Sequence, residues 1–552
     1  MRNRTLNSLS IILTAFVILY GPASGGHASR ASAAASSFQQ KGSVEDAAAL
    51  VTEGVSALEK GDETAAALLF QRAIKIDPGN EMAHTYLGII ADRAGNPAEA
   101  ERHFAAAAIG APTSPAARNN HGAILLRLGR TEQAAKQFEI SLKLDPMQAG
   151  ALANLAQIRF AAGTPEGLRA ARDLFERARA IEPDVEFARA LVVIALRMGD
   201  RASASRYYGD YKALIPGANS RVTGPSGRAE LGTVLYENGL VNEAAEELDA
   251  VVAAEPANVK AIVLLAQTYL ARKDIVSAGR TLESAVARGL DEAPLYAALA
   301  DIYQASGHIE NAIPAMRLAI ERDPKNEAYR FRYGMLLVDT KAPAAAVIRL
   351  REALAEFPNS SKLWFALGVA LFTNRKHDEA ATAFERVVAL SPKFAPALAY
   401  LGMIYDETGR YAEAVALYER AAAADERLAV AQYLLADAMM RQTSPDLARA
   451  ELRLKRALEL DETFSPARLT LAKLYVRAER LTEAVTQLER LVAANPNLAE
   501  AQYQLGRLYM RLKRTAEAQK ALATFKRLNE NQQQQAENDQ QELVRRLANV
   551  RF

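Results

Sequence analysis

The most constraining feature of the sequence is an alanine that returns almost every 34 residues. Nine of the thirteen intervals between successive copies are 34 residues, and a large apolar residue follows each alanine four positions later. The alanines are residues 66, 100, 134, 171, 204, 244, 278, 312, 346, 380, 414, 450, 484 and 518. A fixed period of this length indicates stacked copies of one small structural unit, so it predicts a repeat architecture.

Each copy has the apolar pattern of two short helices joined by a turn. In residues 395–424, apolar side chains follow the i, i+3, i+4, i+7 spacing of a helix face on both sides of Gly409. Glycine is the residue most often found just past a helix end. Gly402 on the first helix and Ala414 on the second are small enough for close approach, and Tyr405 and Tyr418 fill the space beside them. The pattern therefore predicts helix-turn-helix units and an all-α fold.

These copies resemble the tetratricopeptide repeat family. The copy that begins at Ser361 has nearly all of the family's signature residues: Trp364, Leu367, Gly368, Leu371, Ala380, Phe384, Val387 and Pro392. Fourteen copies begin near residues 47, 81, 115, 149, 185, 225, 259, 293, 327, 361, 395, 429, 465 and 499. The resemblance implies a solenoid, a right-handed superhelix of about fourteen helix-turn-helix units, over about 480 of the 552 residues. Insertions are expected around residues 163–165 and 443–445.

The ends of the chain differ from the repeats. Residues 1–33 combine early arginines, a short apolar run and an Ala-Ser-Ala site, which predicts a secretory signal peptide cleaved after Ala33 or Ala28. An uncleaved signal that anchors the chain in the inner membrane is the alternative. Residues 34–46 are expected to form a flexible linker, and residues 217–224 a loop between repeats 1–5 (residues 47–216) and repeats 6–14 (residues 225–528). Residues 529–552 are expected to be a polar segment and a C-terminal helix that caps the solenoid.

Composition excludes several classes of function. The absence of cysteine rules out disulfides, thiol catalysis and cysteine-ligated metal centres. A net charge of +2 gives no reason to expect a nucleic-acid partner. No phosphate loop, dinucleotide-binding, zinc-protease or nucleophile-elbow motif occurs. His84 and His121 are expected to pack inward, and Glu246 and Glu247 to be exposed helix residues. We therefore expect no catalytic residue, metal or cofactor, and no stable membrane span once the signal is removed.

A binding surface is the remaining interpretation. In the family, the first helix of each repeat lines a concave groove, and the resemblance implies that ten residues here form a partner-binding groove. They are Phe331, Met335, Phe365, Phe372, Tyr400, Met403, Tyr433, Met440, Lys473 and Arg507. The corresponding early positions carry Thr85, Asn119, Gln157 and Arg189, and no carboxylate-clamp set of lysine, asparagine and arginine occurs in three successive repeats. The alternative is that curvature of the solenoid buries the large side chains against the next repeat.

The sequence thus favours a non-enzymatic protein–protein interaction scaffold in the bacterial cell envelope, exported to the periplasm, that binds an extended or helical segment of a protein partner. The alternative function is a structural subunit of an envelope secretion or assembly apparatus for polysaccharide, pilus or outer-membrane protein. The identity of the partner is not encoded in any recognisable motif.

Overall fold

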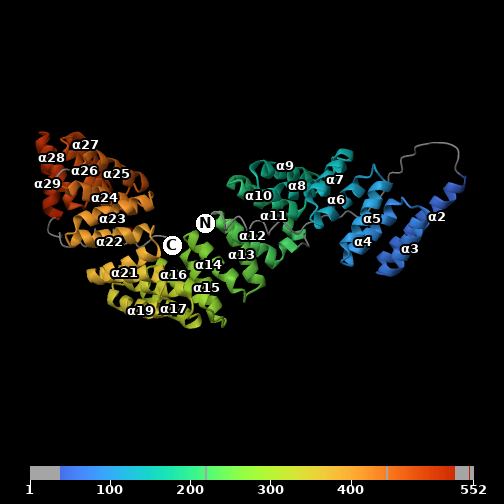
Figure 1. The fold of residues 1–552 in the computed structure, drawn as a ribbon, viewed down its shortest axis with the longest axis horizontal. Helices are drawn as coiled ribbons and strands as arrows, with labels where there is room; N and C mark the ends of the chain where they lie inside the picture. The colour runs from blue at the N-terminus through green and yellow to red at the C-terminus, as the bar shows by residue number, and fades with distance from the viewer. Residues whose placement is uncertain (1–37, 218–220, 443–444, 529–545, 548–552) are drawn as a thin grey trace. The chain divides into compact units, whose positions relative to one another are not determined.

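The computed structural model describes residues 38–217, 221–442, 445–528 and 546–547 (Figure 1). Within these residues the chain forms 28 α-helices, arranged as fourteen consecutive helix-turn-helix pairs. This confirms the all-α repeat fold. The chain divides into two compact bodies, an N-terminal body up to Leu290 and a C-terminal body from Asp291 onward.

The N-terminal body contains seven of the helix pairs and two short 3-10 helices. The pairs are α2 (Phe38–Glu59) with α3 (Glu63–Ile76), α4 (Glu81–Arg93) with α5 (Pro97–Gly110), α6 (Pro115–Arg127) with α7 (Thr131–Leu144), α8 (Ala149–Ala161) with α9 (Pro165–Ile181), α10 (Val185–Arg197) with α11 (Arg201–Leu214), α12 (Pro225–Glu237) with α13 (Val241–Ala254), and α14 (Val259–Ala271) with α15 (Ile275–Ala287). The 3-10 helices, η1 (Ile215–Gly217) and η2 (Arg221–Thr223), lie between α11 and α12.

The C-terminal body contains the other seven pairs. They are α16 (Ala293–Ala305) with α17 (Ile309–Arg322), α18 (Glu327–Asp339) with α19 (Pro343–Glu356), α20 (Ser361–Thr373) with α21 (His377–Leu390), α22 (Ala395–Glu407) with α23 (Tyr411–Ala424), α24 (Ala429–Arg441) with α25 (Leu447–Leu460), α26 (Ser465–Arg477) with α27 (Leu481–Ala494), and α28 (Ala499–Arg511) with α29 (Thr515–Leu528). From the second repeat onward, the first helix of each pair begins at the residue that the sequence register gives.

Local chemistry sets the ends of these helices. The side chain of Asp62 accepts a hydrogen bond from the backbone N–H of Ala65 at 2.9 Å and so caps the start of α3. Ser360 caps α20 in the same way through the N–H of Leu363. The turn inside a repeat needs one residue with positive φ, and Gly409 supplies it at +81°. Five repeats place a charged side chain there instead: Lys273, Lys341, Arg375, Glu479 and Lys513.

A small residue on the first helix sits against a large ring on the second. A Cβ added to Gly402 would lie 2.6 Å from Cε1 of Tyr418, closer than carbon atoms can approach. Gly368 and Phe384 show the same contact at 2.6 Å, and Ala414 is fully buried. These contacts agree with the packing expected from the sequence, and they explain why glycine and the ring recur together.

Three features differ from the expected boundaries. The insertion near residue 163 extends α9 to 17 residues, against 14 in α7, because the extra residues add one turn at the start of the helix. Helix α2 includes the residues from Phe38 onward, so the described part of the expected linker of residues 34–46 is helical. Residues 217–224 do not interrupt the core, since Tyr211, Val222 and Leu231 belong to one buried cluster.

The two ends of the chain are described only in part. Most of residues 529–552 lie outside the described residues, as does the expected signal peptide of residues 1–33. The two described residues of the C-terminal segment, Arg546 and Leu547, contact Phe464 and the surrounding core, two repeats before the end of the array. Among the helices that the structure describes, none combines the length and apolar character needed to cross a membrane.

Candidate partner-binding surface

All ten candidate groove residues lie on first helices of the C-terminal body. They come from α18, α20, α22, α24, α26 and α28. Among these first helices, α18 contacts α20, α22 contacts α24, and α24 contacts α26. Helix α22 also contacts α21, the second helix of the preceding repeat. The side chains are therefore brought together by stacking of repeats, yet the structure divides them into a buried group and a surface group.

The buried group has four members. They are Phe365, Phe372, Tyr400 and Met403. The ring of Phe365 lies 5.9 Å from that of Phe384 on α21, 5.2 Å from that of Phe394 in the following loop and 5.9 Å from that of Tyr400 on α22. Tyr400 also stacks on Phe384 at 4.8 Å, and burial raises the pKa of its hydroxyl.

The expectation that these four residues line an open groove is therefore not met in this structure. A side chain that points between a first helix, its second helix and the next first helix is enclosed on three sides. The large aromatic rings fill that space and become core, which is the packing alternative that the sequence left open. They offer no surface to a partner.

The surface group has six members. Phe331, Met335, Tyr433 and Met440 are half-buried, whereas Lys473 and Arg507 are exposed. Lys473 Nζ lies 3.2 Å from Oε1 of Glu500, and the Arg507 guanidinium lies 5.6 Å from the centre of the Tyr503 ring. Met510 follows Arg507 on α28, and its side chain is 54% exposed. We call these six residues together with Met510 the first-helix surface.

Acidic residues beside the first-helix surface are held by arginines of the next repeat. Arg441 on α24 lies 2.5 Å from Asp406 on α22 and 3.1 Å from Asp437 on its own helix. Arg477 on α26 donates to the backbone carbonyl of Met440 at 2.8 Å. Burial raises the pKa of Asp437 and Asp406 adds to this effect, although Arg441 opposes it. Tyr433 and Met440 therefore share α24 with acidic and basic side chains that are paired with one another.

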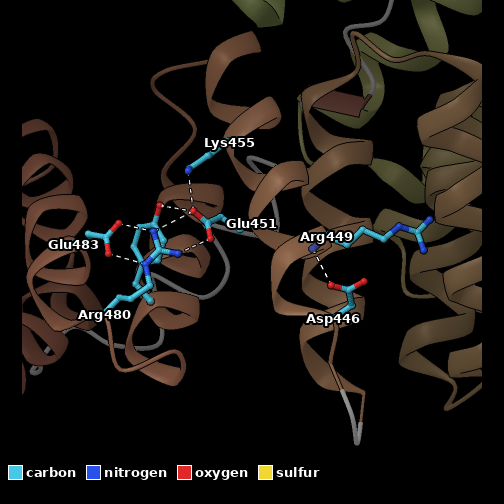
Figure 2. A network of polar contacts seen from close by, with 7 residues as sticks. Asp446, Arg449, Glu451, Lys455, Arg480 and Glu483 are labelled. Atoms are coloured by element: carbon cyan, nitrogen blue, oxygen red, sulfur yellow. Dashed lines mark hydrogen bonds and ion pairs between the residues drawn. The ribbon is translucent and has the colours of Figure 1, made fainter.

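A denser polar network joins the second helix of repeat 12 to both helices of repeat 13 and to the turn between them (Figure 2). Glu451 on α25 accepts hydrogen bonds from Arg480 at 2.6 Å and from Tyr475 at 3.1 Å, and Lys455 lies 2.7 Å away. Burial opposes ionisation of Glu451, but these donors outweigh it and lower its pKa to about 2. Arg480 also pairs with Glu483. Every group in this network has a nearby partner of opposite charge, so its role is to join two repeats.

The polar residues of the early repeats are mostly structural. Thr85, Asn119 and Arg189 are buried, and Gln157 is half-buried. The side chain of Asn119 accepts a hydrogen bond from Asn154 Nδ2 at 3.2 Å. Asn119 thus links α6 to α8, and Arg189 on α10 links to α12 through Glu230 at 3.0 Å.

Glu247 was expected to be an exposed helix residue, and this expectation was wrong. Glu246 is exposed, but Glu247 on α13 is 1% exposed. Its carboxylate accepts hydrogen bonds from the hydroxyls of Tyr208 at 2.9 Å and Tyr211 at 3.5 Å. Burial raises its pKa despite these bonds. The signal in the sequence was its position one residue before Leu248, on the helix face that meets the preceding repeat.

The histidines show one close pair. Nδ1 of His84 lies 3.1 Å from Nδ1 of His103, and Nε2 of His84 lies 3.1 Å from the carbonyl oxygen of Pro78. His84 is buried, and burial together with His84 lowers the pKa of His103. No group of three or more histidine and acidic side chains that could hold a metal ion occurs in the ranges described by the structure.

Comparison with known proteins identifies the repeats. Sequence models described as tetratricopeptide repeat match residues 24–81, 54–115, 119–186, 297–361, 346–395, 365–429 and 401–462. Further models with the same description match residues 235–302 and 444–498, and residues 499–532. A search of curated proteins finds no match.

Two solved structures match parts of this chain at low sequence identity. The crystal structure of the APC/C hetero-tetramer Cut9-Hcn1 is 14% identical, with 84% of this chain and 96% of that chain covered and a TM-score of 0.39. A structure of PilF from Pseudomonas aeruginosa is 18% identical, with 39% of this chain and 94% of that chain covered and a TM-score of 0.34. Since the family matches extend over most of the chain and fall on the same helix pairs, the protein belongs to the tetratricopeptide repeat family.

Proposed function

We propose that the protein is a non-catalytic interaction scaffold that binds an extended or helical protein segment on the first-helix surface of its C-terminal body. The observation that carries the proposal is the partial exposure of Phe331, Met335, Tyr433 and Met440, together with the exposure of Lys473 and Arg507 at the same face of later repeats. Methionine and aromatic side chains provide adaptable contact area, and cations at one end can orient a segment that carries acidic residues.

Charge reversal tests this surface without disturbing the core. The double variant Lys473→Glu with Arg507→Glu changes two exposed side chains, so its helical circular dichroism should match that of the wild type. Affinity purification followed by quantitative mass spectrometry should show at least a tenfold loss of specific partners. Lys520→Glu with Lys526→Glu is the matched control, because both residues are exposed on the second helix α29. Equal capture by both double variants would reject this surface.

We also propose that the protein is exported, acts in the periplasm and lacks residues 1–33 in its mature form. The short apolar run and the Ala-Ser-Ala site support this. N-terminal sequencing of the protein from envelope fractions should give a start just after Ala33 or Ala28. An intact Met1 in the membrane fraction would instead show an anchored chain. Recovery of one fixed multi-protein set in the same fractions would favour an assembly apparatus over a scaffold with varied clients.

A further inference from the structure

Two residues of the C-terminal segment pack against the C-terminal body. Leu547 is fully buried and belongs to the main core cluster of that body. Arg546 forms an ion pair with Asp461, and its guanidinium carbon lies 4.6 Å from the centre of the Phe464 ring. Asp461 and Phe464 belong to the loop between α25 and α26. The contact therefore falls at the junction of repeats 12 and 13, although repeat 14 precedes this segment in the chain.

Asp461 and Phe464, which contact Arg546, are held in place by other contacts within repeats 12 and 13. Asp461 Oδ1 accepts hydrogen bonds from the backbone N–H of Thr463 at 2.9 Å and from its hydroxyl at 2.7 Å, which fixes the carboxylate. Asp461 is also the C-terminal cap of α25, where the partial negative charge of the helix end favours a cation. The ring of Phe464 is fully buried and lies edge-on to that of Tyr433 at 5.2 Å.

This geometry recognises two adjacent side chains by different forces. The fixed carboxylate and the aromatic face together suit a guanidinium, which pairs with an acid and stacks on a ring. The apolar interior beside them accepts a leucine side chain, whose burial is favourable in any peptide that presents it. No part of this recognition requires that the peptide belong to the same chain.

We propose that Asp461, Phe464 and Tyr433 form a docking site for an arginine–leucine motif in a peptide segment, and that Arg546 and Leu547 are its built-in occupant. A partner segment of the same basic and apolar chemistry must displace them. Tethering gives the chain's own motif an effective concentration on the order of millimolar, so it competes strongly with a free peptide. The proposal rests on the proposed function only in that the chain binds protein segments.

A labelled synthetic peptide of residues 537–552, titrated into full-length chains by fluorescence anisotropy, tests the site. The wild type should bind this peptide weakly, because its own motif occupies the site. The full-length Arg546→Glu chain should bind it at least tenfold more tightly. An Asp461→Lys chain should bind the natural peptide no better than the wild type, but should bind a peptide that carries Glu in place of Arg546.

The matched control is an Asp425→Lys chain. Asp425 is the C-terminal cap of α23, the equivalent position one repeat earlier, and it also accepts a backbone hydrogen bond two residues ahead. This chain should bind both peptides as the wild type does. Circular dichroism of every variant verifies folding, and sedimentation at several concentrations should show that the wild-type motif docks within one molecule.

Two outcomes would overturn the docking site. One is an Arg546→Glu chain that binds the natural peptide no more tightly than the wild type. The other is an Asp425→Lys chain that accepts the Glu-bearing peptide as well as Asp461→Lys does. The result is separable from the proposed function, because Lys473→Glu with Arg507→Glu leaves Asp461 and Phe464 unchanged. Loss of partners by that variant, together with no tighter peptide binding by the Arg546→Glu chain, would retain the scaffold and reject only the docking site.

Discussion

Phe365 offers the sharpest test of whether the large first-helix residues are core or binding surface. Its side chain is fully buried among the rings of Phe384, Phe394 and Tyr400. An aromatic side chain buries about 150–250 Å², which at about 25 cal/mol per Å² corresponds to roughly 4–6 kcal/mol as an upper bound. Phenylalanine-to-alanine substitutions in cores typically cost about 3–5 kcal/mol. We therefore expect Phe365→Ala to lower the free energy of unfolding by about 4 kcal/mol.

The chain has a built-in probe for this measurement. Trp364 is its single tryptophan, lies next to Phe365 on α20 and donates a hydrogen bond to the carbonyl of Pro358 at 2.9 Å. Its fluorescence during urea denaturation reports unfolding of the surrounding repeats, whereas circular dichroism reports all of them. Since repeat arrays unfold in coupled segments, the local fluorescence transition is the appropriate quantity. With a slope of about 1–3 kcal/mol per molar urea, the midpoint should fall by more than about 1 M.

Phe331→Ala is the matched control, because Phe331 occupies the same position in the preceding repeat but is half-buried. Phe331→Ala should lower the free energy of unfolding by about half as much as Phe365→Ala, because Phe331 buries a smaller area. The reasoning would be refuted by a Phe365→Ala chain with the midpoint of the wild type. It would also be refuted if the two variants lost stability equally, because the distinction between core and surface would then have no energetic basis.

Three further predictions concern charged residues. Glu247→Gln should stabilise the chain at pH 7, because burial raises the folded pKa of Glu247 and ionisation therefore opposes folding. This penalty grows as pH rises from the unfolded toward the folded pKa, so the gain should vanish in melts at pH 4. Glu451→Gln should instead lower the free energy of unfolding by about 2–3 kcal/mol at pH 7. The folded pKa of Glu451 is about 2 against an ordinary value of 4.5, so its ionised form stabilises the fold above pH 5, and this stabilisation is lost as pH falls toward 2. An equal deficit at pH 2 and pH 7 in urea titrations would contradict this. Lys341→Gly should raise the free energy of unfolding by about 0.5–1 kcal/mol, because Lys341 has φ +58°, and Gly409→Ala at +81° should show the opposite sign in the same assay.

The repeat fold could be predicted because its determinants are close together in sequence. Gly402 and Tyr418 contact each other across one turn, so their spacing is fixed by the lengths of two helices. Because the contacting residues are close in sequence, the same spacing can be recognised in every repeat. Insertions remain visible as a change in spacing, but the sequence does not say whether a loop or a helix absorbs them, and α9 absorbed its insertion as an additional turn.

The state of the candidate site residues could not be predicted in the same way. Phe331 and Phe365 share one register position, yet one is half-buried and the other is fully buried. Exposure at this position depends on which side chains the next repeat supplies, and the rings of Phe394 and Tyr400 close over Phe365. The burial of Glu247 has a similar origin, because Tyr208 and Tyr211 come from the preceding repeat. A register assigns positions, whereas burial depends on pairs of neighbouring repeats.

A contact that breaks the periodicity carries more functional information than one that follows it. Asp425 and Asp461 end equivalent second helices with nearly the same backbone geometry, and each caps its own loop. These capping contacts stabilise the repeat array, and they account for an aspartate at both positions. Only Asp461 also pairs with Arg546, a residue more than two repeats later in the chain. Because capping accounts for the contacts that Asp425 and Asp461 share, the stacking of repeats does not require the additional ion pair of Asp461. Specific recognition of a peptide should therefore be sought at this ion pair.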